Sequence, residues 1–274
     1  MSWSPLTRIR LPILLLILLL PSGCDRPAEI ERPTNVILIS IDTLRADHLG
    51  CYGYPRPTSP TLDRLAAGGI VFEDVSSSAP WTLPAHASLL TGLYPNRNGM
   101  KSHDNFLPEQ VSSLAELLQR AGFVTSAVVN SHNLSQRYGL DRGFASYTYI
   151  EEDVEQREHS AVEETAARWL TAHTGEPFSL FLHYFDVHSD YRSLPAYEEQ
   201  FVRPYHGEAD GSTEQMLAFR RGKLTLDHED TAHLVDLYDA GIRQMDDGIA
   251  RLHALLDSLG YVDNTLLLIT SDHG

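Results

Sequence analysis

Short apolar runs recur along the chain and alternate with longer segments of helical periodicity. Four of these runs are rich in β-branched and aliphatic residues; they begin at Asn35, Phe123, Pro177 and Asn264. A short continuous apolar run is typical of a strand that is buried on both faces, as in a parallel sheet. The four runs therefore predict strands of one mostly parallel sheet.

Between the runs, apolar residues recur every three or four positions, which is the period of an α-helix. The predicted helices cover residues 60–68, 107–122, 151–171 and 231–259. Ser59 is a suitable cap for the first helix. Asp246 and Asp247 in the last one are expected at the surface, with a paired-carboxylate role as the less favoured alternative. Residues 194–230 are polar and irregular. This alternation predicts an α/β fold of three layers, with helices on both faces of the sheet.

Ligand-type side chains follow the first and the last apolar runs. Asp42 ends the first run, and Asp272 and His273 come directly after the last. The carboxyl ends of parallel strands share one edge of a sheet, and α/β proteins bind ligands there. The three side chains are therefore candidate metal ligands. Taken singly, Asp42 is equally explained as a cap or turn residue, and Asp272-His273-Gly274 as a turn.

The segment 79–92 reads Ala-Pro-Trp-Thr-Leu-Pro-Ala-His-Ala-Ser-Leu-Leu-Thr-Gly. It resembles the nucleophile segment of the sulfatases, in the alkaline phosphatase superfamily, where Cys/Ser-x-Pro-x-Arg precedes Ala-Ser-Leu-Leu-Thr-Gly. Pro84 is retained, Thr82 stands in the position of the nucleophile, and His86 stands where the family has Arg. The first and last runs match the family as well, so the resemblance covers residues 35–274.

The resemblance implies that one divalent cation, Ca²⁺, Mg²⁺, Mn²⁺ or Zn²⁺, is held by Asp42, Thr82, Asp272 and His273. Such a cation would activate the Thr82 hydroxyl, which is a weak nucleophile on its own. Sulfatases oxidise Cys or Ser to formylglycine, and Thr cannot form this aldehyde because its β-carbon carries a methyl group. Phosphodiesterases and phosphoethanolamine or phosphoglycerol transferases of the superfamily use Thr directly, so we expect phosphoester rather than sulfate ester chemistry.

Other polar residues are candidates for contacts with the ester. Three histidines are expected to stabilise its charge: His86, His132 and His188. His188 is also a candidate general acid for the leaving oxygen. Asn130 stands where sulfatases carry Lys, and it is a candidate substrate-binding residue. The spacing Asp186-x-His188 differs from the Asp-x-x-x-His of two-metal relatives, which favours one metal, and His183 is assigned to the core.

A second hypothesis follows from the missing Arg and Lys of the family pattern. It is a non-catalytic or decayed sulfatase-fold module that binds sugar or lipid headgroups. Retention of the three metal-ligand positions favours the enzyme. The chain stops at Gly274, directly after these ligands, whereas family members continue with further strands and helices. We therefore expect residues 35–274 to be a catalytic domain that is incomplete at its C-terminus.

The N-terminus has the pattern of an export signal. Two arginines precede an apolar run at residues 11–20, which is too short to span a bilayer. The following Leu-Pro-Ser-Gly-Cys resembles a bacterial lipoprotein processing box, so residues 1–24 are predicted as a lipoprotein-type signal with Cys24 as the lipidated residue. Residues 25–34 form a charged tether. We expect a lipid anchor in a bacterial cell membrane, on the periplasmic or cell-surface side, with an uncleaved anchor as the alternative.

The charge balance limits the range of partners. Asp and Glu number 37 against 21 Lys and Arg, which gives a formal net charge of −16. An acidic protein of this kind is a poor partner for nucleic acid. A small anionic ester stays compatible with it, because a bound metal inverts the local field.

Overall fold

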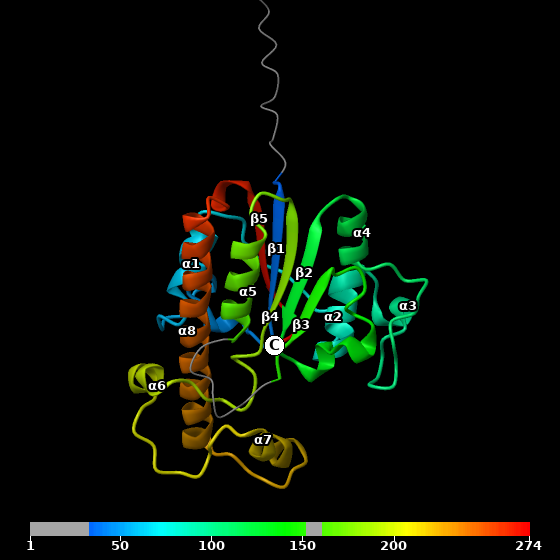
Figure 1. The fold of residues 1–274 in the computed structure, drawn as a ribbon. Helices are drawn as coiled ribbons and strands as arrows, with labels where there is room; N and C mark the ends of the chain where they lie inside the picture. The colour runs from blue at the N-terminus through cyan, green and yellow to red at the C-terminus, as the bar shows by residue number, and fades with distance from the viewer. Residues whose placement is uncertain (1–32, 152–160) are drawn as a thin grey trace, which may run out of the picture. The chain divides into compact units, whose positions relative to one another are not determined.

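The structure is a computed structural model that describes residues 33–151 and 161–274. Its centre is a five-stranded parallel sheet in the order β3-β2-β4-β1-β5 (Figure 1). The strands are β1 Asn35–Ile41, β2 Val124–Val129, β3 Ser146–Tyr149, β4 Phe178–Tyr184 and β5 Thr265–Ser271. The four predicted strands are confirmed. The sequence analysis missed β3, because its four residues are only partly buried or exposed and form no apolar run.

Helices connect the strands. The α-helices are α1 Pro60–Ala67, α2 Thr82–Thr91, α3 Pro95–Asn98, α4 Leu114–Arg120, α5 Ala161–Ala172, α6 Pro195–Phe201, α7 Thr213–Arg220 and α8 His228–Ser258. Short 3₁₀ helices lie at Ala46–His48, Gly50–Tyr52, His132–Leu134, Gln136–Tyr138 and Val262–Asn264. Among the described residues, none of the helices combines the length and the apolar character needed to cross a membrane.

The two faces of the sheet carry separate cores, because successive side chains of a strand point to opposite faces. Ile37, Ile39 and Ile41 of β1 are fully buried in a cluster with residues of α5 and α8. Leu38 packs in a second cluster with Leu83 of α2. Figure 1 shows α5 and α8 on one side of the sheet and α2 and α4 on the other. The predicted α/β fold with three layers is thereby confirmed.

Two helix predictions need correction. The helix predicted at residues 107–122 begins only at Leu114, because a capping box starts it there. The Glu116 amide donates to Ser113 Oγ at 3.0 Å, and the Ser113 amide donates to Glu116 Oε2 at 2.7 Å. Residues 194–230 are not irregular throughout, since they contain α6 and α7.

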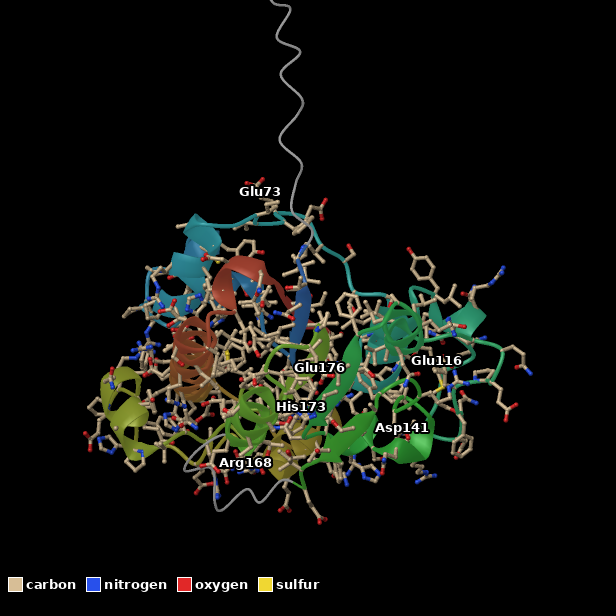
Figure 2. All side chains as sticks on the ribbon, turned by 45° about the horizontal axis from the view of Figure 1, so that its top comes forward. Glu73, Glu116, Asp141, Arg168, His173 and Glu176 are labelled. Atoms are coloured by element: carbon tan, nitrogen blue, oxygen red, sulfur yellow. The ribbon has the colours of Figure 1, made fainter. Side chains whose placement is uncertain are left out.

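Several predictions fall partly or wholly outside the described residues. These are the signal peptide with Cys24, most of the tether, and the first half of the helix predicted at residues 151–171. The described half forms α5, which buries Val162, Ala166 and Leu170. Arg168 points outward from this helix (Figure 2). Glu164 and Arg168 are solvated, as predicted, but Glu163 is 11% exposed and pairs with Arg251 of α8 at 2.9 Å.

Asp246 of α8 is fully buried, so the prediction that it lies at the surface is wrong. Its two carboxylate oxygens accept hydrogen bonds from the Thr61 and Leu62 amides, each at 2.8 Å. These amides lie in the first turn of α1, where the helix offers no acceptor of its own. Ser59, the predicted cap, accepts no hydrogen bond from the amides of that turn, and its hydroxyl donates instead to Asp63 Oδ1 at 3.0 Å. The cap of α1 is thus supplied by a helix about 185 residues away in sequence.

We expect Asp246→Ala to lower the free energy of unfolding by about 1–3 kcal/mol, because two buried amides lose their acceptor. Asp247→Ala is the matched control. Its side chain is 31% exposed and pairs with Arg243, so its loss should cost under about 1 kcal/mol. Urea denaturation of both variants measures the difference. Equal losses would contradict the role of Asp246 as the cap.

Candidate metal centre and nucleophile

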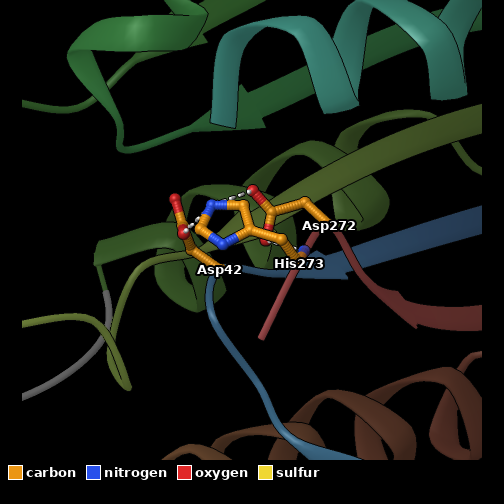
Figure 3. Close-up of side chains that lie close together, drawn as sticks. All are labelled: Asp42, Asp272 and His273. Atoms are coloured by element: carbon orange, nitrogen blue, oxygen red, sulfur yellow. Dashed lines mark hydrogen bonds and ion pairs between the residues drawn. The ribbon is translucent and has the colours of Figure 1, made fainter. Parts of the chain in front are cut away.

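Three of the predicted ligands meet at the carboxyl ends of the adjacent strands β1 and β5. His273 Nε2 lies 3.7 Å from Asp42 Oδ1 and 3.4 Å from Asp272 Oδ2 (Figure 3). One ligand atom from each residue lies within 4.8 Å of the other two. Both carboxylates are buried, with Asp42 at 0% and Asp272 at 4% exposure. The spacing suits the coordination of a single cation.

Backbone amides fix the orientation of Asp272. Its Oδ1 accepts hydrogen bonds from the Thr43 amide at 3.1 Å and from the His273 amide at 2.7 Å. Thr43 has a φ of 56°, a left-handed conformation that is unfavourable for a β-branched residue. The Tyr238 hydroxyl holds this turn, because it donates to the Thr43 carbonyl and accepts from the Arg45 amide. These contacts leave Asp272 Oδ2 directed at the cluster.

Buried acceptors without partners gather at this edge of the sheet. Within the described part of the chain, four such atoms have no hydrogen-bond partner: Asp42 Oδ1, Asp272 Oδ2, His183 Nε2 and His273 Nε2. Buried polar groups are normally paired, since an unpaired one costs roughly 1–3 kcal/mol. Carboxylate and imidazole donors are the groups that bind divalent metals. The residues present therefore fit a metal ion.

The charges of the cluster favour a cation as well. Burial raises the pKa of Asp272 to about 6, and the neighbouring Asp42 carboxylate adds to the shift. Burial acts in the same direction on Asp42, but the adjacent imidazoles of His183, His188 and His86 outweigh it and lower the pKa to about 2. At neutral pH both carboxylates are ionised. Two buried carboxylates with ligand atoms within 4.8 Å of each other are unfavourable unless a positive charge lies beside them.

Thr82 lies where the motif predicted it, at the first residue of α2. Its Oγ1 donates to Asp42 Oδ2 at 3.2 Å, and the residue is 4% exposed. The N-terminus of a helix carries a partial positive charge, which favours a developing alkoxide. The hydroxyl is therefore placed to join the cluster as a fourth ligand, as the resemblance implied.

His86 lies one turn further along α2 and is fully buried. Its Nδ1 donates to the Thr82 carbonyl at 2.8 Å, and its Nε2 accepts from Ser40 Oγ at 2.9 Å. Burial lowers the pKa of His86 to about 3, and His183 adds to the shift, so the ring is neutral at physiological pH. The residue was expected to stabilise the charge of the ester. In the structure it is instead a neutral side chain that supports Thr82 through the hydrogen bond to the Thr82 carbonyl.

His183 was predicted to be a core residue without a role in the site. It is fully buried, as a core residue would be, but its Nε2 lies 3.5 Å from Asp42 Oδ2. Its Nδ1 lies 3.0 Å from Asn130 Oδ1, so the oxygen of the predicted substrate-binding amide is occupied by His183. The alternation of side chains along β4 could have indicated this position. His183 pairs in register with Ser40 of β1 and lies, like Phe181, on the side of the sheet that α2 covers.

The other two predicted histidines lie differently. His188 is half-buried, stacks on Phe185 at 4.2 Å and has Nδ1 at 2.6 Å from the Ser189 carbonyl. It is close enough to Asp42 to lower the pKa of that residue. His132 is exposed, and its ring meets Tyr138 edge-on at 6.4 Å. The structure thus places His188 near the cluster and His132 on the surface beyond β2.

A parallel α/β sheet with carboxylates, an imidazole and a helix-borne hydroxyl at its carboxyl edge defines the class of this protein. The sequence model of the Sulfatase family matches residues 34–274. The chain belongs to the sulfatase family, and its fold is that of the alkaline phosphatase superfamily.

Relatives of known name agree with this assignment. Human N-acetylgalactosamine-6-sulfatase is 28% identical over 89% of this chain and 50% of its own length. The phosphonate monoester hydrolase of Agrobacterium radiobacter has a similar structure, with a TM-score of 0.70, 20% identity, and coverage of 89% of this chain and 63% of its own. A protein solved with its substrate D-glucosamine-2-N,6-O-disulfate also gives a TM-score of 0.70, at 19% identity and coverage of 88% and 65%. The chain spans about half the length of the curated relatives it matches over most of its length.

We expect Asp272→Asn to stabilise the metal-free protein at pH 7.5. The folded-state pKa of Asp272 is raised from 3.8 to about 6, so the folded state binds the proton more tightly and loses stability as pH rises through this window. Removal of the charge should recover up to about 3 kcal/mol above pH 6. Chemical denaturation in a chelator, between pH 4 and 8, measures the effect.

The same variant should lose most of the stabilisation that added Zn²⁺ or Mn²⁺ gives the wild type, because a ligand is removed. Thermal unfolding with and without the metal measures this difference. An unchanged metal effect, or wild-type and variant curves with the same pH dependence, would contradict the assignment of Asp272 to the cluster.

Proposed function

We propose that this chain carries the metal centre and nucleophile of an ester hydrolase or transferase that acts on a small anionic ester, with Thr82 as nucleophile. The observation that supports this most directly is the Thr82 hydroxyl, which lies 3.2 Å from Asp42 Oδ2 in the buried cluster. Among the described residues, Asp42 Oδ1, Asp272 Oδ2 and His273 Nε2 of that cluster have no hydrogen-bond partner. Family membership supports the same reaction class.

The residues of the chain divide the work of such a reaction. A bound divalent metal would supply the positive charge that lowers the pKa of the Thr82 hydroxyl and balances the ester oxygens. Asp42, Asp272 and His273 would hold it. Asp42 Oδ2 orients the hydroxyl, and the N-terminus of α2 favours its ionised form. His188 is the nearby candidate for donating a proton to the leaving oxygen.

Phosphorus is favoured over sulfur as the centre attacked. Thr82 cannot become formylglycine, and its neutral neighbour His86 supplies no positive charge in place of the family's Arg. The proteins of similar structure include a phosphonate monoester hydrolase and a protein solved with a sulfated sugar as its substrate. The same fold is therefore compatible with phosphorus and with sulfur as the centre attacked. A hollow of about 390 Å³ lies between α2 and the end of β5; Asp272 lines it, whereas Thr82, Asp42 and His273 do not.

A non-catalytic binding module is the second candidate function. The observation in its favour is that two predicted contacts to the ester are used internally. His86 is neutral and engaged at both nitrogens, and Asn130 Oδ1 faces His183. With these two groups occupied, less of the site is free to stabilise a transition state.

Thr82→Ala should lower turnover of an aryl phosphate ester by a factor on the order of 10³ or more, because the nucleophile is lost. Thr82→Ser keeps a hydroxyl and should retain measurable turnover. The assay uses the metal-loaded chain with 4-nitrophenyl phosphate, bis(4-nitrophenyl) phosphate and 4-nitrophenyl sulfate. Turnover of the sulfate alone would overturn the phosphoester proposal. Ligand affinity without turnover in the wild type would favour the binding module.

We propose, on the sequence pattern of residues 1–24, that the protein is exported and anchored by lipid at Cys24. In a bacterial expression host the mature protein should start at Cys24 and partition into the membrane fraction. Intact mass spectrometry of that fraction measures the start and the acyl mass, and Cys24→Ser is expected to abolish both processing and acylation. A wild-type protein that starts at Met1 in the membrane would point to an uncleaved anchor.

A further inference from the structure

His183 is held in one tautomer by its neighbour. Its ring is fully buried on β4, with Nδ1 at 3.0 Å from Asn130 Oδ1. A carboxamide oxygen only accepts hydrogen bonds, so Nδ1 carries the proton. Nε2 is then the nitrogen that can offer an electron pair to a cation. A ligating histidine is usually fixed in this way, by a hydrogen bond from the nitrogen that faces away from the metal.

The free nitrogen faces the cluster. His183 Nε2 lies 3.5 Å from Asp42 Oδ2, and it has no hydrogen-bond partner among the described residues. His273 Nε2 lies 3.7 Å from the other oxygen of the same carboxylate. Each oxygen of Asp42 thus has one imidazole beside it. An imidazole nitrogen and a carboxylate oxygen this close are favourable when a proton or a metal ion lies between them.

His86 is a buried histidine in the same environment that serves as a comparison. Its ring centroid is 4.9 Å from that of His183, and it is equally buried. Both of its nitrogens have partners, the Thr82 carbonyl and the Ser40 hydroxyl. The unpaired Nε2 of His183 is therefore a property of that residue and not of buried histidines in this core.

We propose that His183 Nε2 is a further ligand of the metal held by Asp42, and that the centre therefore selects Zn²⁺ or a similar transition metal over Ca²⁺ and Mg²⁺. The proposal rests on the metal site of the proposed function. Imidazole ligands favour Zn²⁺ and its neighbours, whereas Ca²⁺ and Mg²⁺ prefer sites built from oxygen alone. Asn130 acts as a positioning residue, since its oxygen keeps the Nε2 electron pair free.

The test compares Zn²⁺ and Ca²⁺ binding by calorimetry in the wild type and in His183→Gln. We expect Zn²⁺ affinity to fall by about 100-fold or more, beyond the loss of an outer-shell partner, and Ca²⁺ affinity to stay nearly unchanged. X-ray absorption at the zinc edge should show two imidazoles in the wild type and one in the variant. His233→Gln, which removes a histidine stacked on Tyr205 away from the cluster, is the control.

Thermal unfolding shows whether each variant is folded. If His183→Gln does not fold, Asn130→Leu provides the test. Asn130→Leu should lower Zn²⁺ affinity by roughly 10- to 100-fold, and Asn130→Asp should preserve it. Unchanged Zn²⁺ affinity in His183→Gln, higher affinity for both metals, or an equal loss for both would each overturn the proposal. A wild type that binds neither metal would overturn the proposed function itself. A wild type whose X-ray absorption shows a single imidazole at the zinc would overturn only this inference.

Discussion

Two carboxylates, Asp42 and Asp272, lie together in the interior at the ends of adjacent strands, and the surrounding residues hold them in place. Each is positioned by the parallel pairing of β1 with β5. A pair of buried negative charges is unfavourable by itself. The helix start at Thr82 and the two imidazoles at Asp42 are the groups that surround the pair. Electrostatic compensation is thus the constraint that gives these otherwise separate residues a common role.

The long helix α8 stabilises the elements that carry these residues. Its Tyr238 holds the strained turn at Thr43, directly after the first ligand. Its Asp236 and Asp239, both buried, bind the Arg56 guanidinium at 2.8 and 2.6 Å. The loop after β1 is therefore fastened to α8 at several points. The two carboxylates are buried and the Arg56 side chain is 29% exposed, so breaking the pairs would leave buried charges without their partner.

The sequence predicted those features that depend on local pattern. Asp42, Asp272 and His273 follow strands with a clear apolar signature, and the structure brings these three together. Thr82 was proposed from a motif, and its role as nucleophile stays a prediction. Features that depend on neighbours in space were not predicted. A histidine inside an apolar strand, such as His183, gives the same local signal whether it fills the core or faces a cluster. Asp246 likewise looks like any acidic residue on a helix until its contact with α1 is known.

The pairing of β1 with β5 also bears on how the chain folds. The Thr43 amide and Asp272 Oδ1 are 229 residues apart in sequence. Contacts of such long range slow folding, because the chain loses much conformational entropy before they form. Asp272 and His273 can join Asp42 only after β5 has been synthesised and has paired with β1. A cation bound by these three residues would therefore report that the two strands have paired.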